Sequence, residues 1–544
     1  MRKLLITLSC MLLAMQSYGQ DFETATEAVR NMGVGWNLGN TLDAHNNGVQ
    51  QGVDSETYWG QPVTKLELIQ MMKKAGFKAI RVPVTWYNHM DSDGNVDAVW
   101  MARVKEVVDY VIDEGLYCLL NVHHDTGEGS VHWLHASMNT YNSVKARYEH
   151  LWQQIAETFK DYDHHLLFES YNEMLDDYNS WCFASFNTSG KYNATVAADA
   201  YNAINSYAQS FVTTVRNTGG NNAKRNLVVN TYAAVNGGGS WSTYLQDPIK
   251  KMTYPQDDAG AGHIAFQVHA YPTLDNGKAE IDDMVNQLSS YLLTKGPVIL
   301  GEWGSSNVDA AEPDYYKYPT RYLEFAKYMV EKTKAKGIAS FYWMGLSDGA
   351  ARSFPVFSQA DLAETIIKAY YGSSEGFEFP TATSQSSYTC FEGEKVLVWG
   401  NGNVIINNTL FSTFDKTVKL VLTYTATKSG ADIQLYYGGW TAKVPFVIGT
   451  TTYQGDYGPT GSTGTTTTTI TFSESVYTQL TQKGLIIHGD GITLKKVVLE
   501  SGSTGITPLT FKPDDGRVYN LHGQQVAHPQ KGIYISNGRK FVKR

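Results

Sequence analysis

The sequence contains little cysteine, few charged residues and no surplus of positive charge. Four of its 544 residues are cysteines, 18% are charged, and the formal net charge is −9. Nucleic-acid-binding surfaces neutralise phosphates with Lys and Arg, so this balance argues against a nucleic acid partner. Cys118, Cys182 and Cys390 show no zinc-type spacing. Neither a disulfide framework nor a structural metal is expected, although a pair that involves Cys182 stays open.

Long apolar runs are missing as well, except for a short one at the start. No later segment is long and apolar enough to predict a transmembrane helix. At the start, Arg2 and Lys3 precede the apolar run Leu4 to Met15, and the small residues Ser17 and Gly19 follow. This order is typical of a signal peptide, here residues 1–19. We therefore expect a protein that is secreted, or held at the cell surface or in the periplasm.

Aromatic residues, by contrast, are abundant, with 12 Trp and 35 Tyr. Their flat apolar faces and polar edges suit the binding of sugar rings. Many proteins that bind no sugar share this composition, so it indicates only that a neutral polymer is a compatible substrate.

Residues 24–372 alternate short apolar segments with helical patterns. The segments that we predict as buried strands are 33–38, 79–84, 117–122, 165–170, 227–231, 264–268, 297–301 and 338–343. The stretch from Thr64 to Glu67 predicts a capping box that opens a helix, and Gly76 predicts the end of that helix. Eight parallel strands that alternate with helices favour an α/β fold of the closed (β/α)8 TIM-barrel type.

The pattern changes after residue 372, where the helical periodicity stops. Alternating segments at 418–425, 433–437 and 485–488 predict an all-β sandwich over residues 380–502. The run Thr465–Thr469 is expected to form a loop that leads into an edge strand. Residues 505–544 hold strand-sized pieces at 518–521 and 532–535, which predict a short β C-terminal tail.

Seven of the eight predicted barrel strands end in polar or aromatic residues. In such barrels the active site forms at the carboxyl ends of the strands, and polar groups there are costly to bury without partners. These ends carry Asn37, Arg81, His123 and His124, Asn172 and Glu173, His269 and Tyr271, Glu302, and Trp343. Stability alone does not explain such a ring, so we predict a catalytic site.

Two carboxylates on facing strands, Glu173 and Glu302, match the needs of a retaining glycosidase. One group must protonate the departing glycosidic oxygen, and the other must attack the anomeric carbon. Arg81 is expected to keep Glu302 ionised as the nucleophile. Glu173, beside that negative charge, is expected to hold its proton near neutral pH as the general acid/base.

The other candidates surround this pair. His269 and Tyr271 are expected to hydrogen-bond the carboxylates, and Asn172 to bind the substrate 2-hydroxyl. Trp343 is expected to form the floor under the reacting sugar ring. The remaining candidates for substrate contact are Asn37, His124 and Trp133.

Other interpretations of these residues have weaker support. His123, His124 and Asp125 could form a metal site, but neighbours on a strand point to opposite faces and no spaced partner completes the set. No Gly-x-Ser-x-Gly elbow suggests Ser-His-Asp hydrolysis. Trp133 could equally pack within its own loop. We expect no metal and no cofactor.

These motifs resemble glycoside hydrolase family 5 over about residues 24–372. The matching segments are 35–42, 80–83, 121–124, 172–173, 269–271 and 301–304. The family's functional positions match Arg81, His123, Asn172, Glu173, His269, Tyr271, Glu302 and Trp343. The pair Ser170-Tyr171, where Gly-Phe is commoner, departs from the family pattern.

The resemblance is to subfamily 4 in particular, carried by residues 37–43 and 56–60. It implies an endo-β-1,4-glucanase acting on cellulose, mixed-linkage β-glucan or xyloglucan. A β-mannanase or xylanase on the same scaffold stays open, because the groove loops decide the substrate. A non-catalytic glycan-binding surface protein is the other alternative, and it would be expected to lack one of the two carboxylates.

The region after the barrel resembles the accessory modules and C-terminal sorting-type tails of such enzymes. Trp399, Tyr436, Tyr437 and Trp440 could form a sugar platform or could equally belong to the core of the sandwich. The tail, with Asn520–Gly523 and Lys531–Tyr534, would allow attachment to the cell surface.

Overall fold

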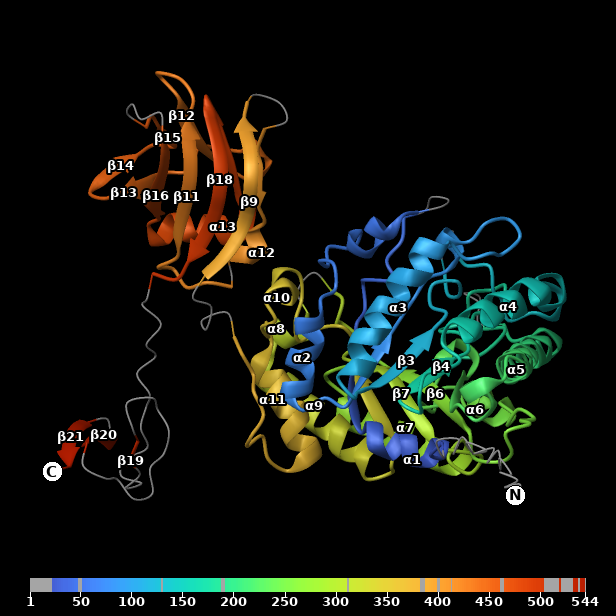
Figure 1. Cartoon of the computed structure of the whole chain (residues 1–544). Helices are drawn as coiled ribbons and strands as arrows, with labels where there is room; N and C mark the ends of the chain where they lie inside the picture. Colours follow the sequence, from blue (N-terminus) through green and yellow to red (C-terminus); the bar gives the residue numbers. More distant parts are fainter. Residues whose placement is uncertain are drawn as a thin grey trace, which may run out of the picture. The chain divides into compact units, whose positions relative to one another are not determined.

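The protein consists of two compact units, Met1–Ala382 and Thr383–Arg544 (Figure 1). The computed structural model describes residues 22–46, 51–128, 131–186, 191–310, 313–381, 387–398, 402–411, 413–459, 464–502, 518–519, 532–536 and 539–543. The expected signal peptide and most of the tail therefore lie outside the described residues. Within these ranges, every helix is too short or too polar to cross a bilayer.

The first unit is a closed barrel of eight parallel strands in chain order, which confirms the predicted TIM-barrel fold. The strands are β1 (Val34–Asn37), β2 (Ala79–Val82), β3 (Tyr117–Asn121), β4 (Leu166–Glu169), β5 (Leu227–Asn230), β6 (Ile264–Ala270), β7 (Val298–Trp303) and β8 (Ala339–Tyr342). The barrel closes where β8 pairs with β1.

Helices surround this barrel (Figure 1). They are α1 (Ala25–Met32), α2 (Leu66–Ala75), α3 (Ala98–Asp113), α4 (Met138–Thr158), α5 (Ala194–Asn217), α6 (Asp247–Lys251), α7 (Gly277–Tyr291), α8 (Asp314–Lys317), α9 (Pro319–Lys334), α10 (Ala350–Ser353) and α11 (Ala360–Tyr371). On the longest of them, α5, the buried residues Ala200, Ile204 and Phe211 are four and seven positions apart, which are one and two helical turns. This spacing gives one apolar face, which packs against the strands.

The start of α2 differs from the prediction. Its N-cap is Lys65, and no side chain caps the helix. The backbone N–H of Thr64 instead donates to Glu56 Oε1 at 2.7 Å. Glu56 is itself held by Arg103 at 2.9 Å, so this buried ion pair replaces the predicted capping box. Gly76 ends the helix as predicted, with the left-handed φ of 103° that glycine tolerates.

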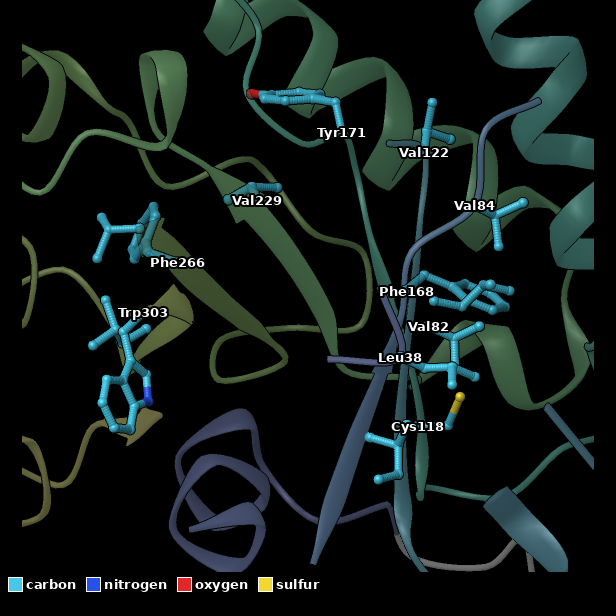
Figure 2. Packing of buried hydrophobic residues seen from close by; sticks show 14 of the residues in the cluster. Leu38, Val82, Val84, Cys118, Val122, Phe168, Tyr171, Val229, Phe266 and Trp303 are labelled. Atoms are coloured by element: carbon cyan, nitrogen blue, oxygen red, sulfur yellow. The ribbon is translucent and has the colours of Figure 1, made fainter. Parts of the chain in front are cut away.

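Apolar side chains between the strands and the helices form the main core. Val82, Cys118, Phe168, Val229 and Phe266 all belong to this cluster (Figure 2). They alternate along the strands with inward-pointing residues, as the two-residue repeat of a strand requires. The three cysteines in the described part of the chain are free, and Cys118 is buried in β3 as predicted.

The interior of the barrel has two layers of different chemistry. The layer toward the strand starts is apolar and packs on α1; its strand residues include Ala79, Leu119, Leu167, Val228, Ala265, Ile299 and Phe341. Two positions further along the strands, the corresponding residues are Arg81, Asn121, Glu169, Asn230, Gln267 and Gly301. The polar layer lies under the carboxyl ends of the strands, where the predicted site is.

The second unit contains two antiparallel sheets, of orders β14-β13-β16-β11-β18-β9 and β10-β17-β12-β15, in agreement with the predicted all-β region. Their strands are β9 (Ser387–Leu397), β10 (Val404–Ile406), β11 (Lys419–Ala426), β12 (Asp432–Tyr437), β13 (Phe446–Ile448), β14 (Thr451–Tyr453), β15 (Asp456–Tyr457), β16 (Thr465–Thr471), β17 (Leu485–Asp490) and β18 (Ile492–Glu500). Two helices, α12 (Asn408–Phe411) and α13 (Glu474–Lys483), complete this region, and β19 (Val518–Tyr519), β20 (Gly532–Ser536) and β21 (Arg539–Lys543) form a separate small sheet.

The threonine run in this unit was predicted as a loop, and that prediction is wrong. Residues 465–471 form strand β16, which pairs with β11 on one side and β13 on the other. Threonine is β-branched and favours strands. The face of β16 with Thr468 and Ile470 is buried, and the Thr468 hydroxyl bonds the Tyr424 hydroxyl at 3.0 Å.

Candidate active site

Arg81, on β2, is the centre of the polar layer. Its side chain is fully buried, and all its N–H groups donate. Nε and Nη2 bind the two oxygens of Glu169, each at 2.7 Å. Nη1 binds Glu302 Oε1 at 2.7 Å, and Nη2 also binds Asn172 Oδ1 at 2.8 Å. Although burial alone favours the neutral form, the paired carboxylates raise the pKa of Arg81, so it stays a cation.

Glu302, on β7, is held at both carboxylate oxygens. Oε1 accepts from Arg81, and Oε2 accepts from the Tyr271 hydroxyl at 2.6 Å. Burial and the two nearby carboxylates, Glu302 and Glu173, raise the pKa of Tyr271 well above its ordinary value. Tyr271 therefore remains a hydrogen-bond donor to Glu302. Charge-assisted hydrogen bonds of this kind are short and strong, so both oxygens of Glu302 are held in place.

Glu173 follows β4 and is more accessible than Glu302. Its side chain is 21% exposed, against 5% for Glu302. His269 Nδ1 lies 2.7 Å from Glu173 Oε1 and 3.6 Å from Glu302 Oε2. One oxygen of each carboxylate and the imidazole nitrogen all lie within 4.8 Å of one another. His269 Nδ1 thus lies between the two carboxylates and is closer to Glu173.

The hydrogen bonds of Asn121 determine the tautomer of His123. Asn121 Oδ1 accepts from the backbone N–H of Val84, so Nδ2 is the group that donates to His123 Nδ1, at 3.0 Å. The hydrogen of the neutral ring is therefore on Nε2, which lies 3.9 Å from Glu302 Oε1. Burial lowers the pKa of His123 well below its ordinary value, so the ring is neutral. His123 can donate one hydrogen bond toward the rim.

Trp343 follows β8 and lies parallel to the His123 ring, with centroids 5.8 Å apart and planes 5° from parallel. It lines an open cavity of about 500 Å³ together with Trp59, His124, Asp309 and other residues. Trp59 is 37% exposed, and His124 is 30% exposed at its side chain. Trp343 and His124, both predicted to contact substrate, thus line a cavity that opens at the rim of the barrel.

A second open cavity, of about 550 Å³, is lined in part by Tyr271. Its lining includes Trp241, Asn236, Glu280 and Asp283. Trp241 is 63% exposed and lies 5.7 Å from the Phe183 ring. The lining of the first cavity includes residues that follow β1 and β8, and that of the second includes residues that follow β5 and β6. The order of the strands in the closed barrel therefore puts exposed tryptophans on two well-separated parts of the rim.

Asn37 lies elsewhere than predicted. It is fully buried, and its Nδ2 donates to the Gly301 carbonyl at 2.9 Å. Its Oδ1 accepts from Arg81 Nη1 at 3.0 Å. A side chain whose two polar ends are used inside the barrel has no access to a substrate, so the predicted substrate contact is wrong. Asn37 positions Arg81 instead.

Asn172 and Trp133 are each oriented by one hydrogen bond. Asn172 Oδ1 accepts from Arg81, which leaves Nδ2 as the donor without an acceptor among the described residues. Trp133 is half-buried, its Nε1 donates to Asp125 Oδ1 at 2.6 Å, and the Arg147 guanidinium lies 4.9 Å from its ring. Trp133 is thus held within its own loop, the alternative left open by the sequence.

The buried carboxylate that anchors Arg81 was not predicted from the sequence. Glu169, on β4, is fully buried, and besides Arg81 it accepts from Asn121 and Asn230, each at 3.1 Å. One signal for Glu169 was available in the sequence. It is a charged residue within a predicted apolar strand, four residues before Glu173. Asn230 ends β5, the one strand for which no site residue was predicted.

A shift in register between β6 and β7 brings His269 opposite Glu302. Val268 pairs with Leu300, but His269 pairs with Glu302, so Gly301 is skipped. A Cβ atom at Gly301 would lie 2.3 Å from the Gln267 side chain. Glycine is therefore required at this bulge, and no periodicity in the sequence indicates it.

Two groups near the site have spacing that a metal ion could use. One contains Glu173, His269 and Glu302, and the other Asp43, His123 and His124. In the first, all three side chains already take part in short hydrogen bonds. In the second, His123 has no free lone pair, because Nδ1 accepts from Asn121 and Nε2 carries the hydrogen. Asp125, the third residue of the metal site considered in the sequence, instead accepts from Trp86 and Trp133.

Comparisons with known proteins agree with this geometry. Residues 42–348 match the cellulase family, glycosyl hydrolase family 5. Endoglucanase A of Clostridium longisporum is 36% identical over 340 residues, which are 59% of this chain and 59% of that protein. The chain thus spans under two thirds of that relative.

Two of the solved structures that match are each similar to about two thirds of this chain. A subfamily 4 broad-specificity endoglucanase from an uncultured bacterium is 58% identical, with a TM-score of 0.63, and covers 65% of this chain and 98% of that one. A family 5 enzyme from Prevotella bryantii, solved with a xyloglucan tetradecasaccharide, is 38% identical, with a TM-score of 0.55, and covers 64% and 99%. The chain belongs to glycoside hydrolase family 5, and its barrel is a glycoside hydrolase domain of the endoglucanase type, similar to subfamily 4.

Proposed function

We propose that the protein is an endo-β-1,4-glucanase that cleaves internal bonds of β-glucans with retention of configuration. The observation that carries this proposal is the close approach of the two carboxylates: an oxygen of Glu173, an oxygen of Glu302 and His269 Nδ1 all lie within 4.8 Å of one another. Retaining glycosidases hold their two carboxyl groups about 5–5.5 Å apart, whereas inverting ones need roughly 6.5–9.5 Å. The close approach supports double displacement.

In the first step Glu302 attacks the anomeric carbon, and Glu173 gives its proton to the departing glycosidic oxygen. Arg81 and Tyr271 hold the two oxygens of the attacking carboxylate in place. His269 fixes Glu173 through its 2.7 Å hydrogen bond. The bond from the anomeric carbon to the leaving oxygen breaks as the glycosyl-enzyme ester at Glu302 forms.

In the second step Glu173, now ionised, takes a proton from water, and the water oxygen attacks the anomeric carbon. Glu302 leaves as a carboxylate, back in its contacts with Arg81 and Tyr271. The Nδ2 group of Asn172 and the Nε2 hydrogen of His123 are the donors available to hydroxyl groups of the reacting sugar. Donors fixed before the reaction stabilise the transition state without reorganisation.

The open cavities on both sides of the pair support endo action on a long chain. Exo action needs one side of the groove to be blocked, whereas here exposed Trp59 and Trp241 line the two sides. Aromatic faces stack on sugar rings. Cellulose, mixed-linkage β-glucan and xyloglucan are the substrates that we propose. The xyloglucan-bound relative from Prevotella bryantii supports the last of these.

Export is a second part of the proposal and rests on the sequence. Residues 1–19 have the order of a signal peptide, and the C-terminal residues 505–544 could attach the protein to the cell surface. An exported enzyme would meet a polymer that is too large to enter the cell.

The test measures viscosity and reducing ends together on soluble β-glucans, with mannan and xylan for comparison. An endo-glucanase lowers viscosity early, before many reducing ends appear. NMR should first detect the β-anomer of the product. Glu302→Gln should lower kcat by about 10⁴-fold or more while glucan binding persists. An initial α-product would reject retention, and turnover of mannan or xylan alone would reject the glucan assignment.

A further inference from the structure

A strained turn in the second unit presents a tryptophan at the surface. The turn Gly438–Trp440 follows β12, and both Gly439 (φ 71°) and Trp440 (φ 59°) have left-handed backbones. A bulky residue rarely adopts this conformation, and such strain persists where the surroundings enforce it, commonly at ligand sites. Gly438 lies against the Lys483 carbonyl, where a Cβ atom would be 1.8 Å away. The turn is thus built around glycines that let Trp440 fold back.

Trp440 folds back beside the outer face of β12. Its ring centroid lies 4.9 Å from that of Tyr436 and 5.5 Å from that of His488. Trp440 remains 44% exposed. Tyr437, the neighbour of Tyr436 on the strand, points the other way and is only 8% exposed. Of the aromatic residues singled out in this unit, Tyr437 belongs to the core, Tyr436 and Trp440 share one surface, and Trp399 lies outside the described residues.

The polar groups around this aromatic pair suit an uncharged ligand rich in hydroxyl groups. The Tyr436 hydroxyl donates to Gln434 Oε1 at 3.0 Å, and Gln434 Nε2 donates to Asp432 Oδ2 at 2.7 Å. Lys443 Nζ lies 5.9 Å from the Tyr436 ring centroid and is paired with Asp456 at 2.6 Å. The cation beside the rings is thus already neutralised. A phosphate or an anionic lipid would compete with Asp456 for Lys443, whereas a sugar needs no positive charge.

We propose that Trp440 and Tyr436 form a second glycan-binding site, separate from the barrel, that takes a β-glucan chain. The C–H face of a sugar ring would stack on the exposed indole, and its hydroxyl groups would bond Gln434 and Asp432. The choice of β-glucan as the ligand rests on the function proposed for the barrel. The position of the site rests only on the contacts of Trp440 and Tyr436. Because the site is on the same chain as the barrel, it raises the local concentration of polymer at the groove.

The test uses the full chain and compares Trp440→Ala with the unchanged protein. Binding is measured by gel retardation in soluble xyloglucan and in hydroxyethyl cellulose, in a Glu302→Gln background that stops digestion of the gel. We expect Trp440→Ala to weaken retardation by about tenfold, the factor that one stacking contact contributes. Trp440→Phe keeps a flat ring and should retain most of the binding. Val396→Ala is the control, since Val396 is an apolar residue that is 56% exposed on β9 of the other sheet.

Hydrolysis separates the failure of this site from the failure of the proposed function. With Glu302 intact, Trp440→Ala should cleave short soluble cello-oligosaccharides with an unchanged kcat/KM. If cello-oligosaccharides are cleaved but Trp440→Ala is retarded like its parent, the second site is rejected and the glucanase stands. If no β-glucan is cleaved, the glucanase assignment fails. Should Trp440→Ala not fold, Tyr436→Ala replaces it, and equal retardation of that variant rejects the site in the same way.

Discussion

Two fully buried arginines, Arg81 and Arg225, lie at opposite ends of the barrel and differ in their partners. At the carboxyl ends of the strands, Arg81 donates to two carboxylates, Glu169 and Glu302. At the opposite end, before β5, Arg225 donates to four backbone carbonyls and to Asn222 Oδ1. Paired carboxylates raise the pKa of Arg81, whereas burial lowers that of Arg225. All the N–H groups of both side chains donate, which requires the charged form of each.

This difference separates function from stability within one fold. Arg225 ties together the chain from Phe159 to Leu166 and stabilises it through neutral acceptors. Arg81 holds a carboxylate that the proposed chemistry uses. In the proposed double displacement, the charge of Glu302 is lost when the glycosyl-enzyme ester forms and returns when the ester is hydrolysed. Removal of the first should therefore affect folding, and removal of the second should affect catalysis.

The largest effect is expected for Arg81→Lys. Lysine is a point charge without the planar fork, so it cannot bind Glu169 in two places and still reach Glu302. We expect kcat/KM on soluble β-glucan to fall by about 10³-fold, because fixed charge stabilisation at the nucleophile is lost. Arg103→Lys is the matched control: Arg103 also binds one carboxylate, Glu56, through two nitrogens, but away from the site. Equal losses in both variants would contradict the comparison.

At the other end, Arg225→Met should unfold more easily and yet remain active. The substitution leaves the carbonyls of Phe159, Tyr162 and Leu166 buried without this donor. We expect a loss of about 3–5 kcal/mol in the free energy of unfolding, measured by urea denaturation. At low temperature the folded fraction should keep its kcat. Arg321→Met, which removes a surface pair with Asp275, should change stability by less than about 1 kcal/mol. A large fall in kcat for Arg225→Met would show that Arg225 also affects catalysis and would contradict the comparison.

A smaller effect should separate two histidines by their response to acid. His89, after β2, is buried, and its pKa is lowered to about 4. Between the ordinary value of 6.5 and 4, the unfolded chain binds more protons than the folded one. The contribution of His89 is thus present above pH 6.5 and is lost as the pH falls toward 4, by up to about 3 kcal/mol.

His165, before β4, has the opposite sign. Its pKa is raised by Asp163, whose carboxylate lies 3.1 Å away. Its contribution is complete below the ordinary pKa and is lost as the pH rises through the folded value. Urea denaturation at several pH values between about 5 and 8 should show a flatter acid decline for His89→Gln and a steeper one for His165→Gln. Shifts of the same sign in both variants would refute these assignments.

Much of this architecture could be predicted from the sequence, and the exceptions have physical reasons. All eight strands follow from short apolar runs, and Glu173 and Glu302 come after the ends of two of those runs. Arg81 and Glu169 both lie within predicted strands, and Glu169 was missed because a period of two residues marks only the face on which a side chain lies. Asn37 was predicted to contact substrate, because only its contacts with Arg81 and Gly301 reveal that both of its polar ends are used inside the barrel. Contacts between strands far apart in the sequence leave no local pattern.

The smallest effect is expected from removal of the second unit. Every candidate that surrounds the carboxylates lies before residue 350, and the barrel core extends to Phe377 and Phe379. Phe357 N–H donates to the Pro380 carbonyl at 2.7 Å, and the ring of Phe377 lies 5.1 Å from that of Tyr371.

A chain of residues 22–381 should therefore cleave soluble cello-oligosaccharides with a kcat/KM within about twofold of the full protein, since every contact described for the site lies within these residues. A chain that ends at residue 372 lacks both phenylalanines and should have a lower Tm with the same kcat, provided that the assay temperature keeps it folded. If the 22–381 chain folds but is inactive, the second unit contributes to the site, and the rim of the barrel is not sufficient for the chemistry.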